Sequence, residues 1–162
     1  MKWLILPAFW FLYWGICFLC TGTDKKNLAG LRSYPKAVQA LVQAELPESA
    51  PKEKSVPSIL FGNLMLFTVV FSLLGLIFKR VLAFDGYFST FVYFLILGEG
   101  LGIFDLLIID LLWWRSTKRI RFSFLPEKEA YQNPEMHIGS FVRGIPLFAV
   151  IAALSALIVS LF

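Results

Sequence analysis

Residues 84–114 decide the fold and read FDGYFSTFVYFLILGEGLGIFDLLIIDLLWW. The run is apolar over most of its length, and the acids Glu99, Asp105 and Asp110 interrupt it. A transmembrane helix needs about 20 mostly apolar residues, so this run is long enough to cross a bilayer. The Trp113–Trp114 pair at its end is typical of a membrane–water interface. The run therefore predicts a membrane-spanning helix that carries buried acids.

The composition of the whole chain points to the same class of protein. Hydrophobic residues make up 58% of the 162 residues and charged residues only 16%, whereas soluble domains contain about 45–50% and about 25%. Aromatic residues reach 17%. These values exclude a disordered tail, a coiled-coil rod and a soluble domain, and they indicate an integral membrane protein.

Three further apolar runs accompany the first one. Together they predict an all-α, integral membrane bundle of four transmembrane helices in a single domain, residues 1–162. The predicted helices cover residues 3–20, 58–78, 87–114 and 141–161.

The distribution of basic residues predicts the topology. Most of the 15 lysines and arginines lie in or beside the predicted loops 21–57 and 115–140. The positive-inside rule then places both loops in the cytoplasm and both termini outside a cell membrane.

A shorter amphipathic segment lies inside the first loop. Pro35 suits a first helical turn, and Val38, Leu41, Val42 and Leu46 follow at helical spacing. This pattern predicts a short interfacial helix on the inner leaflet.

The last predicted span has a start signal upstream of its apolar run. Asn133, Pro134 and Glu135 supply a cap, a first-turn proline and an acid. We expect a helix that begins there and continues into the span.

The three acids of the long run carry most of the functional signal. An ionisable group at membrane depth costs roughly 2.5–3.5 kcal/mol and usually faces the protein interior or a wet cavity. On a regular α-helix Glu99 and Asp110 share a face, and Asp105 points about 120° away from it. One straight helix therefore cannot aim all three acids at one partner.

The glycines at positions 98, 100 and 102 leave two alternatives open. They could break the helix and turn Glu99 to another face, as in transporters with discontinuous helices. Alternatively, they could allow another helix to pack closely.

Polar residues of neighbouring spans supply candidate partners for the acids. We predict a ligand-binding cluster near the inner leaflet, built from Asn63, Asp105, Asp110, His137 and Arg143, with Tyr131 above it and Glu99 deeper. A purely structural alternative pairs Asp110 with Arg115 or Arg143 as an anchor of the bundle. For Glu99 the structural alternative is a protonated, hydrogen-bonded carboxyl.

The cofactor and partner expectations follow from the residue types. Asp105 and Asp110 offer hard oxygen ligands that could hold a divalent cation, whereas one histidine is too few for a histidine-based zinc site. The net charge of +4 suits anionic lipids of the bilayer, and no basic run suits nucleic acid. Four short spans would be few for a monomeric transporter, so we expect a homo-oligomer or a partner membrane subunit.

The C-terminal part of the chain carries a resemblance. Phe104-Asp105-Leu-Leu-Ile-Ile-Asp110-Leu, a basic stretch, and then Tyr131, His137 and Gly144 resemble a pattern in uncharacterised bacterial multi-pass membrane proteins. The resemblance covers roughly the last 60 residues and implies a membrane fold without implying an activity.

Three functions fit these features. The first is binding or transport of a cation, a proton or a lipid-like ligand at the intramembrane carboxylates. The second is a lipid-modifying enzyme that uses a carboxylate–histidine pair as acid and base. The third is an accessory subunit whose polar groups only stabilise a membrane complex.

Overall fold

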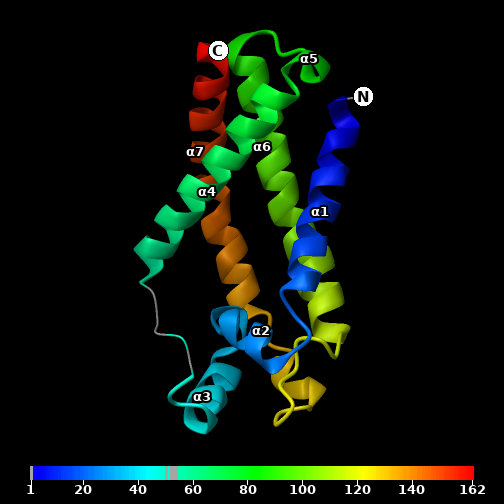
Figure 1. Ribbon diagram of the computed structural model, residues 1–162, viewed down its shortest axis with the longest axis vertical. Helices are drawn as coiled ribbons and strands as arrows, with labels where there is room; N and C mark the ends of the chain where they lie inside the picture. The colour runs from blue at the N-terminus through cyan, green and yellow to red at the C-terminus, as the bar shows by residue number, and fades with distance from the viewer. Residues whose placement is uncertain (1, 50, 52–54) are drawn as a thin grey trace. The chain divides into compact units, whose positions relative to one another are not determined.

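The regular elements are all helices in the computed structural model, which describes residues 2–49, 51 and 55–162 (Figure 1). Of the predicted first loop, residues 50 and 52–54 lie outside the described residues. The elements in chain order are η1 (Lys2–Leu4), α1 (Ile5–Leu19), α2 (Asp24–Ala29), η2 (Leu31–Ser33), α3 (Lys36–Glu45), α4 (Val56–Ile77), α5 (Lys79–Leu82), α6 (Gly86–Phe104), η3 (Asp105–Trp114), η4 (Lys128–Tyr131) and α7 (Glu135–Leu161). Within the described residues no β-strand forms, which confirms the all-α prediction.

Among the described residues, three helical segments are long and apolar enough to cross a membrane. They are α4, the continuous helix Gly86–Trp114, and the stretch Lys128–Leu161 that contains α7. This finding supports a membrane protein by length and composition. Helix α1 is apolar but has only 15 residues, and at 1.5 Å per residue it measures about 22 Å against a hydrocarbon core of about 30 Å. To form the predicted fourth span, α1 would therefore need additional residues at one of its ends.

The chain divides into two compact units. Unit 1 contains Met1–Trp10, Lys54–Ile103 and Val142–Phe162, and unit 2 contains Phe11–Glu53 and Phe104–Phe141. Helices α1 and α7 contribute residues to both units, as does the continuous helix Gly86–Trp114.

The core of unit 1 is aromatic and joins α4, α6 and α7. The Phe71 ring of α4 stacks on Phe94 of α6 at 5.6 Å and on Phe148 of α7 at 6.3 Å. The Ser155 hydroxyl of α7 donates to the Thr68 carbonyl of α4 at 3.3 Å. These contacts fix three apolar helices against one another through dispersion and ring packing.

The glycines of α6 serve close packing. The helix remains α-helical across residues 98–102. A Cβ added at Gly98 would lie 2.7 Å from the Phe148 Cδ1 atom, and one at Gly100 would lie 2.3 Å from the Trp10 Cζ2 atom. Of the two alternatives left open by the sequence, the structure supports helix packing and shows no break at these glycines.

The irregularity of the long helix occurs later, where α6 becomes a π-helix. Segment η3 runs from Asp105 to Trp114 in the π form. The expectation of a regular α-helix from 87 to 114 is therefore wrong for its last ten residues. In a π-helix residue i bonds to i+5, so side chains five positions apart return to nearly the same side. Asp105 and Asp110 are such a pair, which corrects the expected divergence of their side chains.

Unit 2 contains a folded layer built from both predicted loops. Its buried core combines residues of the predicted loops 21–57 and 115–140 with the last residue of η3: Leu31, Tyr34, Val38, Val42, Trp114, Ile120, Phe122 and Tyr131. The predicted helix near residues 36–46 forms as α3. Its Val38 and Val42 side chains are completely buried in this core, whereas Leu41 is 51% exposed. Two of the four residues expected to face lipid therefore face protein.

The predicted start of the last helix is confirmed. Helix α7 begins at Glu135, and the Glu135 backbone N–H donates to the Asn133 side-chain oxygen at 2.9 Å. The helix continues to Leu161. Because it begins at Glu135, His137 lies in its first turn.

Candidate functional site

The clearest polar contact of unit 2 joins η3 to the first turn of α7. The His137 Nδ1 atom lies 2.9 Å from the Asp110 Oδ2 atom, and the two side chains are 6% and 14% exposed. Removal of both groups from water strengthens their mutual attraction and makes either one costly to leave alone. The contact can therefore hold a proton between a carboxylate and an imidazole.

The ring of Trp114 completes one wall of this contact. Its centroid lies 5.6 Å from that of His137 at 67°. The Trp114 ring also packs edge-on to Tyr34, at 5.0 Å, so it connects the site with the core of the loop layer. A rigid aromatic neighbour limits the orientations that the imidazole can adopt.

Asp105 belongs to the same neighbourhood through the π-helical register. Its carboxyl group interacts electrostatically with that of Asp110. Two carboxyls in a partly buried site disfavour simultaneous ionisation because like charges repel in a low dielectric. With His137 they give three titratable groups in one region of unit 2.

Helix α1 packs along η3 through aromatic side chains. The Phe11 ring lies 5.4 Å from Phe104, and the Phe18 ring lies 6.2 Å from Trp113. Between these contacts, Tyr13 and Cys17 of α1 are hydrogen-bonded to each other through their side chains, and both interact electrostatically with Asp105 and Asp110.

Two cations hold the end of α1 in place. The Arg119 guanidinium donates to the carbonyls of Phe18 and Thr21 at 3.1 and 3.0 Å, and Lys26 Nζ donates to the Leu19 carbonyl at 2.9 Å. Arg119 also lies 3.8 Å above the Phe18 ring. Positive charge at the C-terminal end of a helix complements its dipole and satisfies its last carbonyls.

The structural alternative for Asp110 has a different partner from the arginines expected. Among the described residues the structure pairs its carboxylate with His137, and Arg115 forms no ion pair with it; Arg143 belongs to unit 1. The Arg115 carbonyl instead accepts a hydrogen bond from Gln132 Nε2 at 3.0 Å.

Tyr131 lies in the core of the loop layer. Its hydroxyl donates to the Leu125 carbonyl at 2.8 Å and accepts from the Phe122 N–H at 3.0 Å. Both hydrogen-bonding functions of the phenol are thus used to fix the loop 115–140. Tyr131 therefore stabilises the loop layer of unit 2.

The other predicted ligand residues belong to unit 1. Asn63 lies on α4 and Glu99 on α6, both partly buried, and Arg143 is exposed on α7. Of the predicted set, unit 2 holds Asp105, Asp110, His137 and Tyr131. It places Asp110 in contact with His137 and within electrostatic range of Asp105.

Metal-ligating side chains do not gather anywhere in residues 2–49, 51 and 55–162. No group of three His, Cys, Asp or Glu side chains has the arrangement of a metal site there. The expected divalent cation therefore has no three-residue ligand set within this part of the chain.

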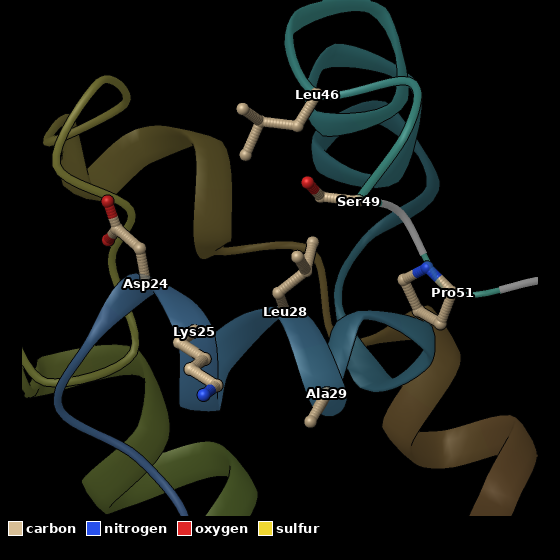
Figure 2. Close-up of a pocket in the computed structure, with 7 residues that line it drawn as sticks. All are labelled: Asp24, Lys25, Leu28, Ala29, Leu46, Ser49 and Pro51. Atoms are coloured by element: carbon tan, nitrogen blue, oxygen red, sulfur yellow. The ribbon is translucent and has the colours of Figure 1, made fainter.

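A shallow pocket of about 500 Å³ lies in unit 2, and neither Asp105 nor Asp110 lines it (Figure 2). It is lined by Asp24, Lys25, Leu28, Ala29, Leu46, Ser49 and Pro51. Figure 2 shows Leu28 pointing from α2 toward the segment with Ser49. The Asp24 carboxylate is already engaged, because it accepts from the Ser123 N–H at 3.0 Å and from its hydroxyl.

Sequence reasoning missed Tyr13 and Cys17 as neighbours of the acids, because both lie in an uncharged apolar run. Their four-residue spacing, which puts two polar side chains on one helical face, was the available signal. Comparison of the chain with protein-family models, curated proteins and solved structures found no match.

Proposed function

We propose that this chain is a multi-pass membrane protein that binds and transfers protons at Asp105, Asp110 and His137. The contact of 2.9 Å between His137 Nδ1 and Asp110 Oδ2 carries the proposal. A nearly buried carboxylate–imidazole pair places a proton donor and a proton acceptor within hydrogen-bond distance of each other. Ionisable groups at membrane depth commonly mark proton relays.

Asp105 gives the pair a second acceptor. When Asp110 and His137 share a proton, the repulsion between the two carboxyls is relieved, and Asp105 can release its own proton. When the shared proton leaves, Asp105 is favoured to take one up. The π-helical register supports this alternation because it turns both carboxyls to one side.

The proposal includes the topology expected from the sequence. Four spans, cytoplasmic loops and outside termini agree with the shared core of the two loops, since segments that pack together must lie on one side of a membrane. The excess of basic residues in the loops supports the cytoplasmic side. Anionic lipids are the expected neighbours of these loops, and a homo-oligomer or a partner subunit remains part of the proposal.

A reporter active only outside the cytoplasm tests this topology. Fused after Phe162 it should be active, and fused at Ser49 it should be silent. The reverse pattern would contradict the proposed orientation.

Proton transfer is tested with purified protein in liposomes that contain a pH-sensitive dye. A potassium diffusion potential should drive proton entry through the wild-type protein. Asp110→Asn and Asp105→Asn should each slow entry by about tenfold or more, because each removes one proton-transfer group.

The matched control is Glu127→Gln, which neutralises an exposed acid of the loop 115–140 and should leave the flux unchanged. If the wild-type protein is folded and protons enter its liposomes no faster than empty liposomes, proton transfer is refuted. Equal flux in Asp110→Asn and wild type would refute the site.

The same pair supports a second function, a lipid-modifying enzyme with acid–base catalysis. Asp110 contacts Nδ1 of His137, which leaves Nε2 as the nitrogen that could act as a base. This function predicts that the purified protein converts a lipid of its own membrane, with loss of turnover in His137→Ala. If neither flux nor lipid turnover occurs, the accessory-subunit function is favoured, and Asp110→Asn should then alter only assembly or stability.

A further inference from the structure

Helix α1 and the π-helix η3 run in the same direction within unit 2 and are in register. Phe11 contacts Phe104 at the beginning of the shared stretch, and Phe18 contacts Trp113 at its end. Trp14 adds a second contact to Trp113, at 6.2 Å and 84°. The residues between these contacts are therefore level with one another on the two helices.

The polar residues of the two helices fall inside this stretch at matching intervals. Tyr13 and Cys17 are four apart on the α-helix, where that spacing keeps side chains on one face. Asp105 and Asp110 are five apart on the π-helix, where the longer spacing has the same effect. The different helical repeats thus produce two polar pairs of similar pitch.

The two polar pairs also interact. Tyr13 and Cys17 are joined by a side-chain hydrogen bond, and each lies within electrostatic range of both carboxyl groups. Tyr13 and Cys17 are themselves partly buried, so water is not their main neighbour. The Tyr13 hydroxyl is engaged with Cys17 in this structure, and an ionised carboxylate is a stronger hydrogen-bond acceptor than a thiol.

The geometry points to Tyr13 as a further residue of the proton path, whose hydroxyl donates a hydrogen bond to the ionised form of Asp105. This inference rests on the proposed function and adds a group of α1 to its proton path. When Asp105 is protonated, the same hydroxyl can accept the proton's hydrogen bond, because a phenol is both donor and acceptor. Tyr13 would thus extend the path from α7, through η3, to α1.

Tyr13→Phe deletes only the hydroxyl group and is the decisive variant. We expect it to slow proton entry into liposomes by about tenfold. We also expect the infrared carbonyl band of the protonated carboxyl, identified by its loss in Asp105→Asn, to move to higher frequency because the hydrogen bond is gone. Tyr87→Phe is the matched control, since Tyr87 is an exposed tyrosine of α6 in unit 1, and it should change neither flux nor band.

The outcomes separate this inference from the proposed function. If Tyr13→Phe leaves flux and band unchanged while Asp110→Asn stops the flux, the role of Tyr13 is refuted and the proton site stands. A shifted band with wild-type flux would also refute a role in transfer. Absence of flux in the wild-type protein would refute the proposed function and this role with it.

A second variant covers a failure of Tyr13→Phe to fold. Replacement of Tyr13 by 3-fluorotyrosine keeps the hydroxyl and nearly the same shape but makes the phenol more acidic. We expect the pH dependence of the flux to move to lower pH, with no movement for 3-fluorotyrosine at position 87. An unmoved profile would overturn the inference.

Discussion

His137 Nδ1 lies 2.9 Å from Asp110 Oδ2, and this contact joins the first turn of α7 to the π-helix η3. A neutral imidazole carries its proton on one nitrogen, and a carboxylate acceptor selects the nitrogen that it faces. The contact therefore determines a tautomer, which can be measured without knowledge of any ligand.

The first prediction concerns that tautomer. His137 is the single histidine of the chain, so nitrogen-15 labelling of histidine gives one pair of ring signals. At alkaline pH, where the imidazole is neutral, we expect the Nδ1–H form in the wild-type protein. Asp110→Ala should lose this preference, whereas Glu127→Gln should keep it. The same tautomer in wild type and Asp110→Ala would show that Asp110 does not orient the ring.

The second prediction concerns close packing in unit 1. Gly98→Ala places a Cβ atom 2.7 Å from the Phe148 ring, so we expect a loss of about 1–3 kcal/mol of stability through overpacking. Gly15→Ala is the matched control, because nothing lies within 4 Å of its added Cβ atom. It should be neutral or stabilising by up to about 1 kcal/mol, since alanine favours helix. Reversible unfolding in mixed micelles measures both, and equal effects would contradict the packing role.

The third prediction concerns the Tyr34 hydroxyl in the loop layer. It donates to the Ile120 carbonyl at 2.7 Å, and the whole side chain is buried. Tyr34→Phe leaves that carbonyl without its partner, so we expect a loss of about 1–3 kcal/mol. Protease resistance of the loop layer measures the loss. Tyr87→Phe serves as the exposed control, and equal resistance in both variants would contradict the prediction.

The fourth prediction concerns the same phenol at high pH. Burial raises the pKa of Tyr34, and the nearby Tyr131 phenol adds to the effect. A raised pKa means that the neutral form is favoured in the folded state. The stabilisation is therefore fully present below the ordinary tyrosine pKa of about 10 and is lost as the pH rises above it. Wild-type protein should lose stability there more steeply than Tyr34→Phe, and parallel pH profiles would contradict this expectation.

The fifth prediction concerns Asn27, which joins the two loops. Its Nδ2 group donates to the carbonyls of Arg119 and Arg121 at 3.0 and 3.3 Å, and it is 2% exposed. Asn27→Asp replaces a donor by a buried acceptor that faces two other acceptors. We expect a loss of about 1–3 kcal/mol or more, measured by protease resistance. Gln43→Glu, an exposed amide-to-acid change on α3, should have little effect.

The sequence predicted what local patterns determine. Apolar length predicted the three long helices, the spacing of Val38 and Val42 predicted α3, and Asn133 predicted the start of α7. The glycines of α6 indicated close helix packing as one of two alternatives. Each of these features depends on residues close to one another in the chain.

The features that the sequence did not predict depend on contacts between segments that are distant in the chain. Segment η3 is π-helical, and nothing in the pattern of its residues separates a π-helix from an α-helix. The same holds for α3. The sequence predicts that its valines face lipid, whereas in the structure they pack in a protein core with Ile120 and Phe122. Asp110 and His137 were both named from sequence, and only the structure gives their separation.

The π-helix has a final consequence for the thickness of the membrane. As an α-helix, the 29 residues Gly86–Trp114 would measure about 43 Å, well beyond a hydrocarbon core of about 30 Å. A π-helix has more residues in each turn and rises less per residue, so η3 shortens this span. Thin bilayers should therefore favour the π form and thick bilayers the α form, which rotates Asp105 away from Asp110. Acyl-chain length would then control the carboxyl pair, and reconstitution in short-chain and long-chain lipids measures whether proton flux follows it.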